Sequence, residues 1–169
     1  MSDAPLFRSC PLPGGHELGP FNCSEEALDF WLKSTARHAQ AARTAHTFVW
    51  ESAENATHVV AYYALSAHLI RRAEVRNVMG SGLGRYVPAT LIGKLALDES
   101  LHAQGLGKRL VVDALNRIIE SSMSGPASAA VLIHAHSNRA RQLYESLGFR
   151  QVSDGGNAML LKLSDFAID

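Results

Sequence analysis

The chain runs Leu95-Ala96-Leu97-Asp98-Glu99-Ser100-Leu101-His102-Ala103-Gln104-Gly105-Leu106-Gly107-Lys108-Arg109 where an apolar strand turns into a helix. Successive backbone amides at such a turn point toward one spot, and the helix N-terminus adds about half a positive charge. Lys108 and Arg109 suit the helix dipole poorly, but they suit a nearby phosphate. The segment therefore predicts a phosphate site at Gly105, with an ordinary glycine turn and exposed cations as the alternative.

Other phosphate motifs fit this segment less well. A Walker loop requires Ser or Thr after its lysine, whereas Arg109 and Leu110, neither of which has a hydroxyl, follow Lys108 here. A dinucleotide motif requires a third glycine at a fixed interval after Gly107, and the sequence has none there. The second glycine-rich piece, residues 80–84, runs into Arg85 and not into a helix, so we interpret it as a flexible loop.

Hydrophobic periodicity outlines the remaining elements. It predicts helices at residues 24–42 with Ser24 as N-cap, at 105–122, and at 138–147 with Gly148 as the stop. Apolar runs predict strands, of which the first two form an antiparallel hairpin: residues 46–51, 58–66, 90–98, 129–135 and 158–163. Residues 68–87 are expected to be irregular. This order predicts an α/β layer structure with a mixed sheet.

Composition narrows the class of protein. The 169 residues, 47% of them apolar, suit one soluble globular domain. No stretch is long and apolar enough to span a bilayer, and residues 1–5 do not resemble a secretory signal, so we expect a cytoplasmic protein without membrane contact. Cys10 and Cys23 match no disulfide framework or zinc spacing, and we expect reduced thiols and no metal.

Charge is unevenly distributed although the formal net charge is zero. Residues 61–150 hold 11 basic and 6 acidic side chains. Either a polyanionic ligand or chance scatter over a solvated surface accounts for this excess.

Two motifs in order give the sequence a family resemblance. Residues 95–109 and the downstream run Ser137-Asn138-Arg139-Ala140-Arg141-Gln142-Leu143-Tyr144-Glu145-Ser146-Leu147-Gly148-Phe149 resemble the GNAT acetyltransferase superfamily. Residues 19–23, 61–66 and 93–98 narrow this to the GNAT toxins of bacterial type II toxin-antitoxin modules, over residues 16–163. One departure is His102, which stands where the family has Arg or Gln.

The resemblance implies a fold, an activity and partners. It implies one GNAT domain over residues 1–169, with a mixed central sheet whose central strands splay and are flanked by helices. Family members acetylate the α-amine of aminoacyl-tRNA with acetyl-CoA, which blocks translation. A ribbon-helix-helix antitoxin usually silences them, and homodimers are usual.

The resemblance also assigns roles to residues. Tyr144 is expected to protonate the departing thiolate. Acetyl-CoA is expected at Leu95, Leu97, Gln104, Gly105, Leu106, Gly107, Lys108, Arg109 and Asn138. The tRNA is expected at the basic side chains Arg71, Arg72, Arg76, Arg85 and Lys94.

The residues themselves leave alternatives open. Tyr144 lies in an apolar stripe and can fill the core, Asn138 can cap its helix, and the arginines can be solvated. Asp98 and Glu99 are either bases or turn residues, and the two histidines His134 and His136 are expected to be structural or to contact water. The rival functions are an acetyltransferase for a small amine or a protein N-terminus, and a non-catalytic regulator that binds coenzyme A or an antitoxin.

Overall fold

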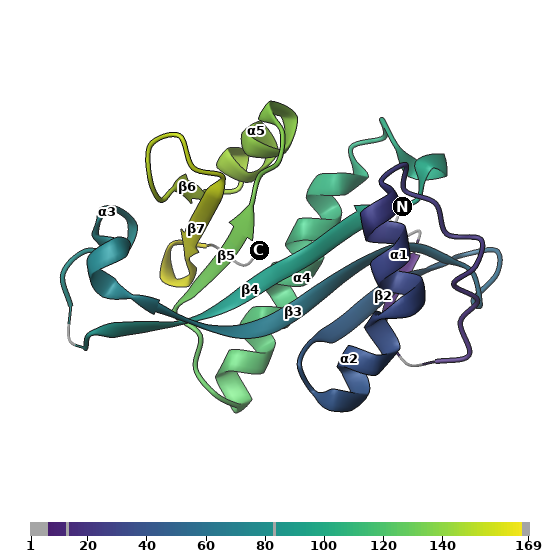
Figure 1. Ribbon diagram of the computed structural model, residues 1–169, viewed down its shortest axis with the longest axis horizontal. Helices are drawn as coiled ribbons and strands as arrows, with labels where there is room; N and C mark the ends of the chain where they lie inside the picture. Colours follow the sequence, from purple (N-terminus) through teal and green to yellow (C-terminus); the bar gives the residue numbers. More distant parts are fainter. Residues whose placement is uncertain (1–6, 13, 83, 167–169) are drawn as a thin grey trace, which may run out of the picture. The chain divides into compact units, whose positions relative to one another are not determined.

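The computed structural model describes residues 7–12, 14–82 and 84–166, which form a mixed α/β fold (Figure 1). Within these residues, seven strands are hydrogen-bonded in the order β1-β2-β3-β4-β5-β7-β6. The strands are β1 Phe7–Pro11, β2 His46–Ser52, β3 Val59–Arg71, β4 Tyr86–Leu97, β5 Ala130–His134, β6 Arg150–Gln151 and β7 Ala158–Lys162. The helices are α1 Glu26–Ser34, α2 Ala36–Ala42, α3 Arg76–Met79, α4 Leu106–Ser124 and α5 Asn138–Ser146, with short 3-10 turns η1 Arg72–Glu74, η2 Glu99–Leu101 and η3 Leu163–Asp165.

The predicted mixed sheet and the predicted hairpin are confirmed. β2 pairs antiparallel with β3, and β4 pairs parallel with β5. The chain clusters into two compact units, the first comprising Met1–Ser66 and Lys94–Asp113, the second Ala67–Gly93 and Ala114–Asp169. β3, β4 and α4 contribute residues to both units.

Tyr62 organises the core of the first unit. Its fully buried ring stacks on Trp31 at 6.0 Å between centroids and meets the edge of Phe21 at 5.6 Å. Its hydroxyl donates a 2.7 Å hydrogen bond to the Leu28 carbonyl, which ties α1 to β3. In Figure 1, α1 and α2 lie across one face of β2 and β3.

The predicted helix at residues 24–42 is wrong in two details. It is two helices, α1 and α2, separated at Thr35, because the Ser34 hydroxyl donates to the Phe30 carbonyl and competes with the backbone bonds of the last turn. Ser24 is not the N-cap. Its backbone has a φ of 70°, the helix begins after Glu25, and the Ser24 hydroxyl donates to Glu99 instead.

The second unit is built around β5. Ala89 to Ile92 of β4 pair with Ala130 to Ile133 of β5, and β7 pairs along the other edge of β5. The predicted irregular segment at residues 68–87 is partly wrong. β3 continues to Arg71, η1 and α3 follow, and β4 begins at Tyr86, because Val75 and Val87 are buried in this unit's core and fix the segment.

Two further strands were not predicted from the sequence. β1 pairs antiparallel with β2, and β6 pairs antiparallel with β7 over Arg150 and Gln151 alone. Both are short, and β1 ends at Pro11, so neither shows a clear alternation of apolar and polar residues. Among the described residues, no helix combines the length and the apolar character that a membrane crossing requires.

Candidate active site

The turn that leads from β4 to α4 is held by its own side chains. Asp98 caps η2, accepting hydrogen bonds from the Ser100 amide at 3.0 Å and hydroxyl at 2.7 Å. The His102 ring lies with Nε2 2.9 Å from the Leu97 carbonyl, and Gln104 Nε2 donates to the Ser100 carbonyl at 3.0 Å. The turn is therefore shaped before any ligand binds.

The residues that lead into α4 are exposed and have an unusual backbone conformation. Ala103 and Gly105 both have left-handed φ values, 62° and 72°, and α4 begins at the next residue, Leu106. Buried Leu106 anchors the first turn, whereas Lys108 and Arg109 are exposed. The first turn contains no acidic residue, and the first amides of a helix lack partners within it. This arrangement can bind an anion, as the sequence predicts.

The end of β4 lies in the same unit as this turn. Leu95 and Leu97 are half-buried, and the Asp98 amide donates to the Val60 carbonyl of β3 at 2.8 Å. The register of β4 with β5 ends at Ile92 and Ile133, before Leu95 is reached. The unit thus brings together the predicted cofactor residues from Leu95 to Arg109.

Asp98 and Glu99 make the hydrogen bonds of turn residues. The Asp98 carboxylate accepts from the Asn22 amide as well as from Ser100, and Glu99 accepts from the Ser24 hydroxyl. Partial burial works to raise the pKa of Asp98, but the hydrogen bonds from Ser100 and Asn22 outweigh it and hold the pKa below its ordinary value. A carboxylate with a lowered pKa is a weak base, which favours the turn alternative.

Tyr144 and Asn138 both lie on α5 in the second unit. Tyr144 is 7% exposed, and its ring packs 5.9 Å from that of Phe149. Asn138 is exposed and does not cap the helix, because the cap is Ser137, whose hydroxyl accepts from the Ala140 amide at 3.1 Å. The side chain of Asn138 is thus not needed to begin α5.

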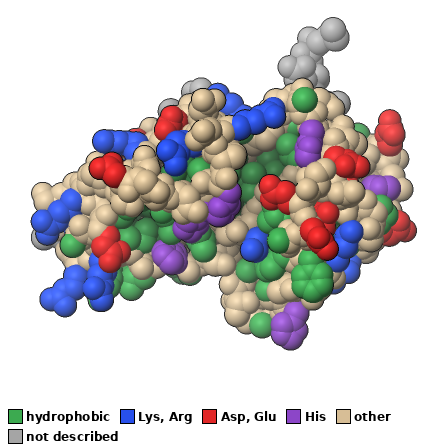
Figure 2. All heavy atoms as spheres, turned by 45° about the horizontal axis from the view of Figure 1, so that its top comes forward, with side chains coloured by type: hydrophobic (Ala, Val, Ile, Leu, Met, Phe, Trp, Pro, Cys, Tyr) green, Lys and Arg blue, Asp and Glu red, His purple; other side chains and the backbone are tan. Residues whose placement is uncertain are grey.

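The predicted tRNA-binding residues differ in their surroundings. Arg71, Arg76 and Arg85 are exposed. Arg72 is half-buried and donates through Nε to the Gly84 carbonyl at 2.9 Å, so its side chain helps to hold the loop. Whereas the four arginines belong to the second unit, Lys94 belongs to the first, and its Nζ lies 5.9 Å from the centroid of the Trp31 ring. Figure 2 shows blue Lys and Arg side chains on the left of its view, with red acidic side chains among them.

The first unit also contains a pocket that the sequence did not indicate. It is a shallow, open hollow of about 440 Å³ between the turn at residues 19–24 and α1. Its walls are polar as well as apolar: Gly19, Pro20, Phe21, Asn22, Ser24, Glu26, Asp29 and Lys33. Asn22 joins this pocket to the cofactor turn, because its carbonyl accepts from the Glu99 amide at 2.8 Å. Such a pocket assembles residues from a turn and a helix face, so no single motif predicts it.

His134 and His136 lie in the second unit as a stacked pair of rings, 6.4 Å between centroids. Burial lowers the pKa of His134, and the neighbouring His136 and His68 lower it further. His136 Nδ1 lies 3.4 Å from the side-chain Nδ2 of Asn157. These contacts agree with the structural role expected for the pair.

The sequence matches one family model and is similar to proteins that are named as toxins. The model of the FR47-like protein family matches residues 69–155. The chain is 28% identical over 135 residues to a tRNA-acetylating toxin of Mycobacterium tuberculosis, covering 79% of this chain and 78% of that protein. It is 24% identical over 165 residues to a probable toxin TacT of Sinorhizobium fredii, covering 90% and 88%.

Two solved structures resemble the fold closely. AtaT complexed with acetyl-methionyl-tRNAfMet matches with a TM-score of 0.84 at 24% identity, covering 94% of this chain and 95% of that one. A tyrosine-to-phenylalanine mutant of AtaT, bound to the C-terminus of the antitoxin AtaR and acetyl-CoA, matches with a TM-score of 0.75 at 23% identity, covering 94% of both chains. These likenesses confirm the fold expected from the sequence.

Proposed function

Because the chain belongs to the FR47-like family of GNAT acetyltransferases, we propose that it is an acetyl-CoA-dependent N-acetyltransferase toxin. It acetylates the α-amine of aminoacyl-tRNA and thereby blocks translation. The observation that carries this proposal is the entry to α4, where the exposed, left-handed Gly105 precedes a first turn with exposed Lys108 and Arg109. The first amides of such a helix have no partner within it. The tRNA-acetylating relative supports the choice of acceptor.

Acetyl-CoA binds through backbone groups in this proposal. The amides from Gln104 to Arg109 hold the pyrophosphate, and exposed Lys108 and Arg109 add positive charge beside it. The pantetheine arm, a rod of amides, pairs with the backbone of Leu95 and Leu97 and contacts Asn138. The Leu97 amide stabilises the oxyanion that forms on the thioester carbonyl; one such donor contributes about 2.7 to 4 kcal/mol.

Tyr144 is the general acid in this proposal, and no dedicated base is required. Its hydroxyl gives a proton to the thiolate of coenzyme A as the acetyl group leaves. An α-amine with a pKa of about 7.7 to 8.0 has a substantial neutral fraction near neutral pH, whereas a lysine side chain near about 10.4 has almost none. Esterification to tRNA lowers the pKa of the α-amine further, because the ester carbonyl withdraws electrons. The weak basicity of Asp98 is therefore compatible with an aminoacyl acceptor.

The tRNA backbone contacts the exposed arginines of the second unit. Arg71, Arg76 and Arg85 are available for phosphates, and such contacts supply affinity without reading sequence. Arg72 and Lys94 are secondary candidates, because each already has a partner in the fold.

Partners and location complete the proposal. We expect an antitoxin of the ribbon-helix-helix type, a homodimer, and action in the cytoplasm, where charged tRNA is found. The AtaT structure with the AtaR C-terminus supports an antitoxin partner.

The decisive experiment is an acetyl-transfer assay. The purified chain is incubated with labelled acetyl-CoA and charged bulk tRNA, and label is expected on the aminoacyl group. Uncharged tRNA is the matched control and should stay unlabelled. Label on polyamines or peptide N-termini, with none on charged tRNA, would show that the acceptor is a small amine or a protein; absence of any transfer would favour the non-catalytic regulator.

A further inference from the structure

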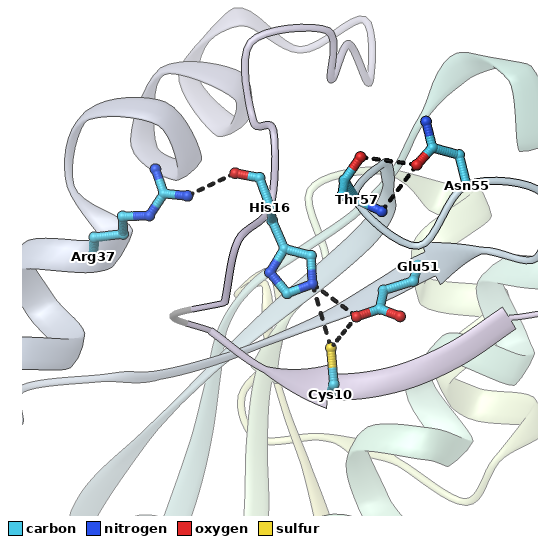
Figure 3. A network of polar contacts seen from close by, with 6 residues as sticks. All are labelled: Cys10, His16, Arg37, Glu51, Asn55 and Thr57. Carbon is cyan, nitrogen blue, oxygen red and sulfur yellow. Dashed lines mark hydrogen bonds and ion pairs between the residues drawn. The ribbon is translucent and has the colours of Figure 1, made fainter.

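Three potential metal ligands meet in the first unit, away from the turn into α4. Cys10 lies on β1, Glu51 on β2, and His16 in the segment after β1 (Figure 3). Cys10 Sγ lies 3.0 Å from Glu51 Oε1 and 3.5 Å from His16 Nε2, and the latter two atoms are 2.9 Å apart. All three ligand atoms lie within 4.8 Å of one another.

Strand register explains why Cys10 and Glu51 meet. Arg8 pairs with Glu51, and Cys10 pairs with Val49, so Cys10 and Glu51 are diagonal neighbours on the same face of the β1–β2 ladder. The pairing of β2 with β3 shifts register between Trp50 and Glu51. Such an irregularity can re-aim a side chain, and here it occurs at the carboxylate.

The third member, His16, is fixed in place by its neighbours. Its carbonyl accepts from Arg37 Nη2 at 2.8 Å (Figure 3). The next amide, that of Glu17, donates to the Thr57 carbonyl at 2.9 Å. A side chain at Gly14 would place its Cβ 2.6 Å from the ring, so glycine is required for this approach. The ring is therefore held in position before any ligand arrives.

The geometry distinguishes a metal site from a catalytic relay. A nucleophile, a histidine and a carboxylate in relay use both ring nitrogens, one on each side. Here the thiol and the carboxylate both approach Nε2, while the buried Nδ1 has no hydrogen-bond partner among the described residues. Three donor atoms thus converge on one point, as the ligands of an ion do.

We propose that Cys10, His16 and Glu51 bind a zinc ion, with water as the fourth ligand. Thiolate, imidazole and carboxylate are the donors that zinc takes. In a tetrahedron with bonds of about 2.0 to 2.3 Å, such donors lie about 3.3 to 3.6 Å apart. The Sγ–Nε2 distance of 3.5 Å already matches, and the two carboxylate distances, 3.0 and 2.9 Å, lengthen by about half an ångström when the ion replaces the shared protons.

The other thiol in the chain provides the matched control. Cys23 is 6% exposed, and burial, with a hydrogen bond to Asp29, raises its pKa to about 11. A thiol that resists deprotonation is a poor metal ligand, because the thiolate is the form that binds. Cys23→Ser therefore removes a thiol from the same unit without touching the proposed site.

Cobalt serves as the spectroscopic probe for zinc. The full chain is titrated with Co²⁺ in the presence of a reductant that is not a thiol. It carries no histidine tag, because a tag would add cobalt ligands to the 8 histidines of the sequence. We expect one tightly bound ion with a thiolate-to-cobalt charge-transfer band, which Zn²⁺ abolishes. The band should be lost in Cys10→Ser and kept in Cys23→Ser, and Glu51→Gln should weaken affinity at least about tenfold.

Thermal melting gives a second readout. Zn²⁺ should raise the melting temperature of the unaltered chain and of Cys23→Ser, but not that of Cys10→Ser. Absence of the band from the unaltered chain, or its persistence in Cys10→Ser, overturns the proposal. If Cys10→Ser does not fold, Glu51→Gln provides the test. An unchanged cobalt affinity in Glu51→Gln also overturns the proposed zinc site.

Discussion

Gly105 and Gly155 form a natural pair for testing the turn into α4. Their φ values are 72° and 75°, and a Cβ at either position would meet no atom within 4 Å. Alanine at either site should therefore lower the free energy of unfolding by about 1 to 2 kcal/mol, which is the strain of a left-handed backbone at a residue with a Cβ. Gly105 lies in the proposed cofactor turn, whereas Gly155 lies in the second unit before β7.

The two alanine variants should lose similar stability but differ in ligand binding. Gly105→Ala should weaken acetyl-CoA binding by about tenfold or more, because relief of the strain rotates the amides that hold the pyrophosphate. Gly155→Ala should bind acetyl-CoA as the unaltered chain does. Calorimetric titration and urea unfolding measure the two effects separately. Equal affinities in both variants would remove the turn from the cofactor site.

Tyr144 can act as the general acid or only pack in the core, and removal of its hydroxyl distinguishes the two roles. Tyr144→Phe keeps the buried ring against Phe149 but removes the hydroxyl. If Tyr144 is the general acid, transfer to aminoacyl-tRNA should fall by about 10² to 10⁴-fold while acetyl-CoA affinity stays within about twofold. Tyr86→Phe, at an exposed tyrosine in the same unit, is the control. Unchanged transfer by Tyr144→Phe would leave Tyr144 with a packing role alone.

Among the elements, the segment from η1 to the start of β4 carries the proposed tRNA surface. Arg71→Ala, Arg76→Ala and Arg85→Ala together should flatten the plot of log affinity against log salt by about 0.7 to 0.9 for each phosphate that an arginine no longer neutralises. Lys33→Ala, an exposed cation on α1, should leave the slope unchanged. Binding of charged tRNA across a salt series measures this. If the triple variant has the same salt dependence of tRNA affinity as the unaltered chain, the tRNA does not bind at these arginines.

Arg72 is left out of that triple variant for a structural reason. Its side-chain Nε donates to the Gly84 carbonyl at 2.9 Å, so alanine there would disturb the loop as well as the charge. Sequence composition cannot make this distinction, because an arginine that binds a backbone carbonyl and one that faces solvent are the same letter in the sequence.

Local patterns predicted the elements that bury a regular face. α4 and α5 lie within two residues of their expected bounds, and Gly148 follows α5 with a φ of 101°. The break at Thr35 was missed because it depends on one local hydrogen bond, from the Ser34 hydroxyl to the Phe30 carbonyl, which hydrophobic periodicity does not register. The extension of β3 to Arg71 was missed because burial of Val75 and Val87 fixes the segment that follows it. The meeting of Cys10 with Glu51 depends on strand register, which sequence spacing does not contain.

For the chain as a whole, connectivity argues for cooperative unfolding. β3, β4 and α4 each contribute residues to both compact units, so neither unit can lose these elements without the other losing them too. We therefore expect a single transition in urea. The protonation of a titratable group in either unit should then shift the same urea transition. A pH series of urea unfolding can therefore report on groups in both units.

Acid should destabilise the whole chain through two groups with lowered pKa values. His134, in the second unit, has a pKa lowered from 6.5, so below about pH 6.5 the unfolded chain takes up a proton that the folded chain resists. The contribution of His134 to the free energy of unfolding is complete above pH 6.5. It is lost as the pH falls toward the lowered pKa of the folded chain. Asp98, in the first unit, has a pKa lowered from 3.8, so its contribution is complete above that pH and is lost as the pH falls through the lowered value.

Urea unfolding at about pH 7.5, 5.5 and 3 measures these contributions. His134→Asn should reduce the loss of unfolding free energy between the first two pH values, and Asp98→Asn should reduce the loss between the last two. A decline between pH 7.5 and 5.5 that is as steep in His134→Asn as in the unaltered chain would mean that other groups destabilise the protein in acid, and that the stacked pair His134 and His136 has no part in it.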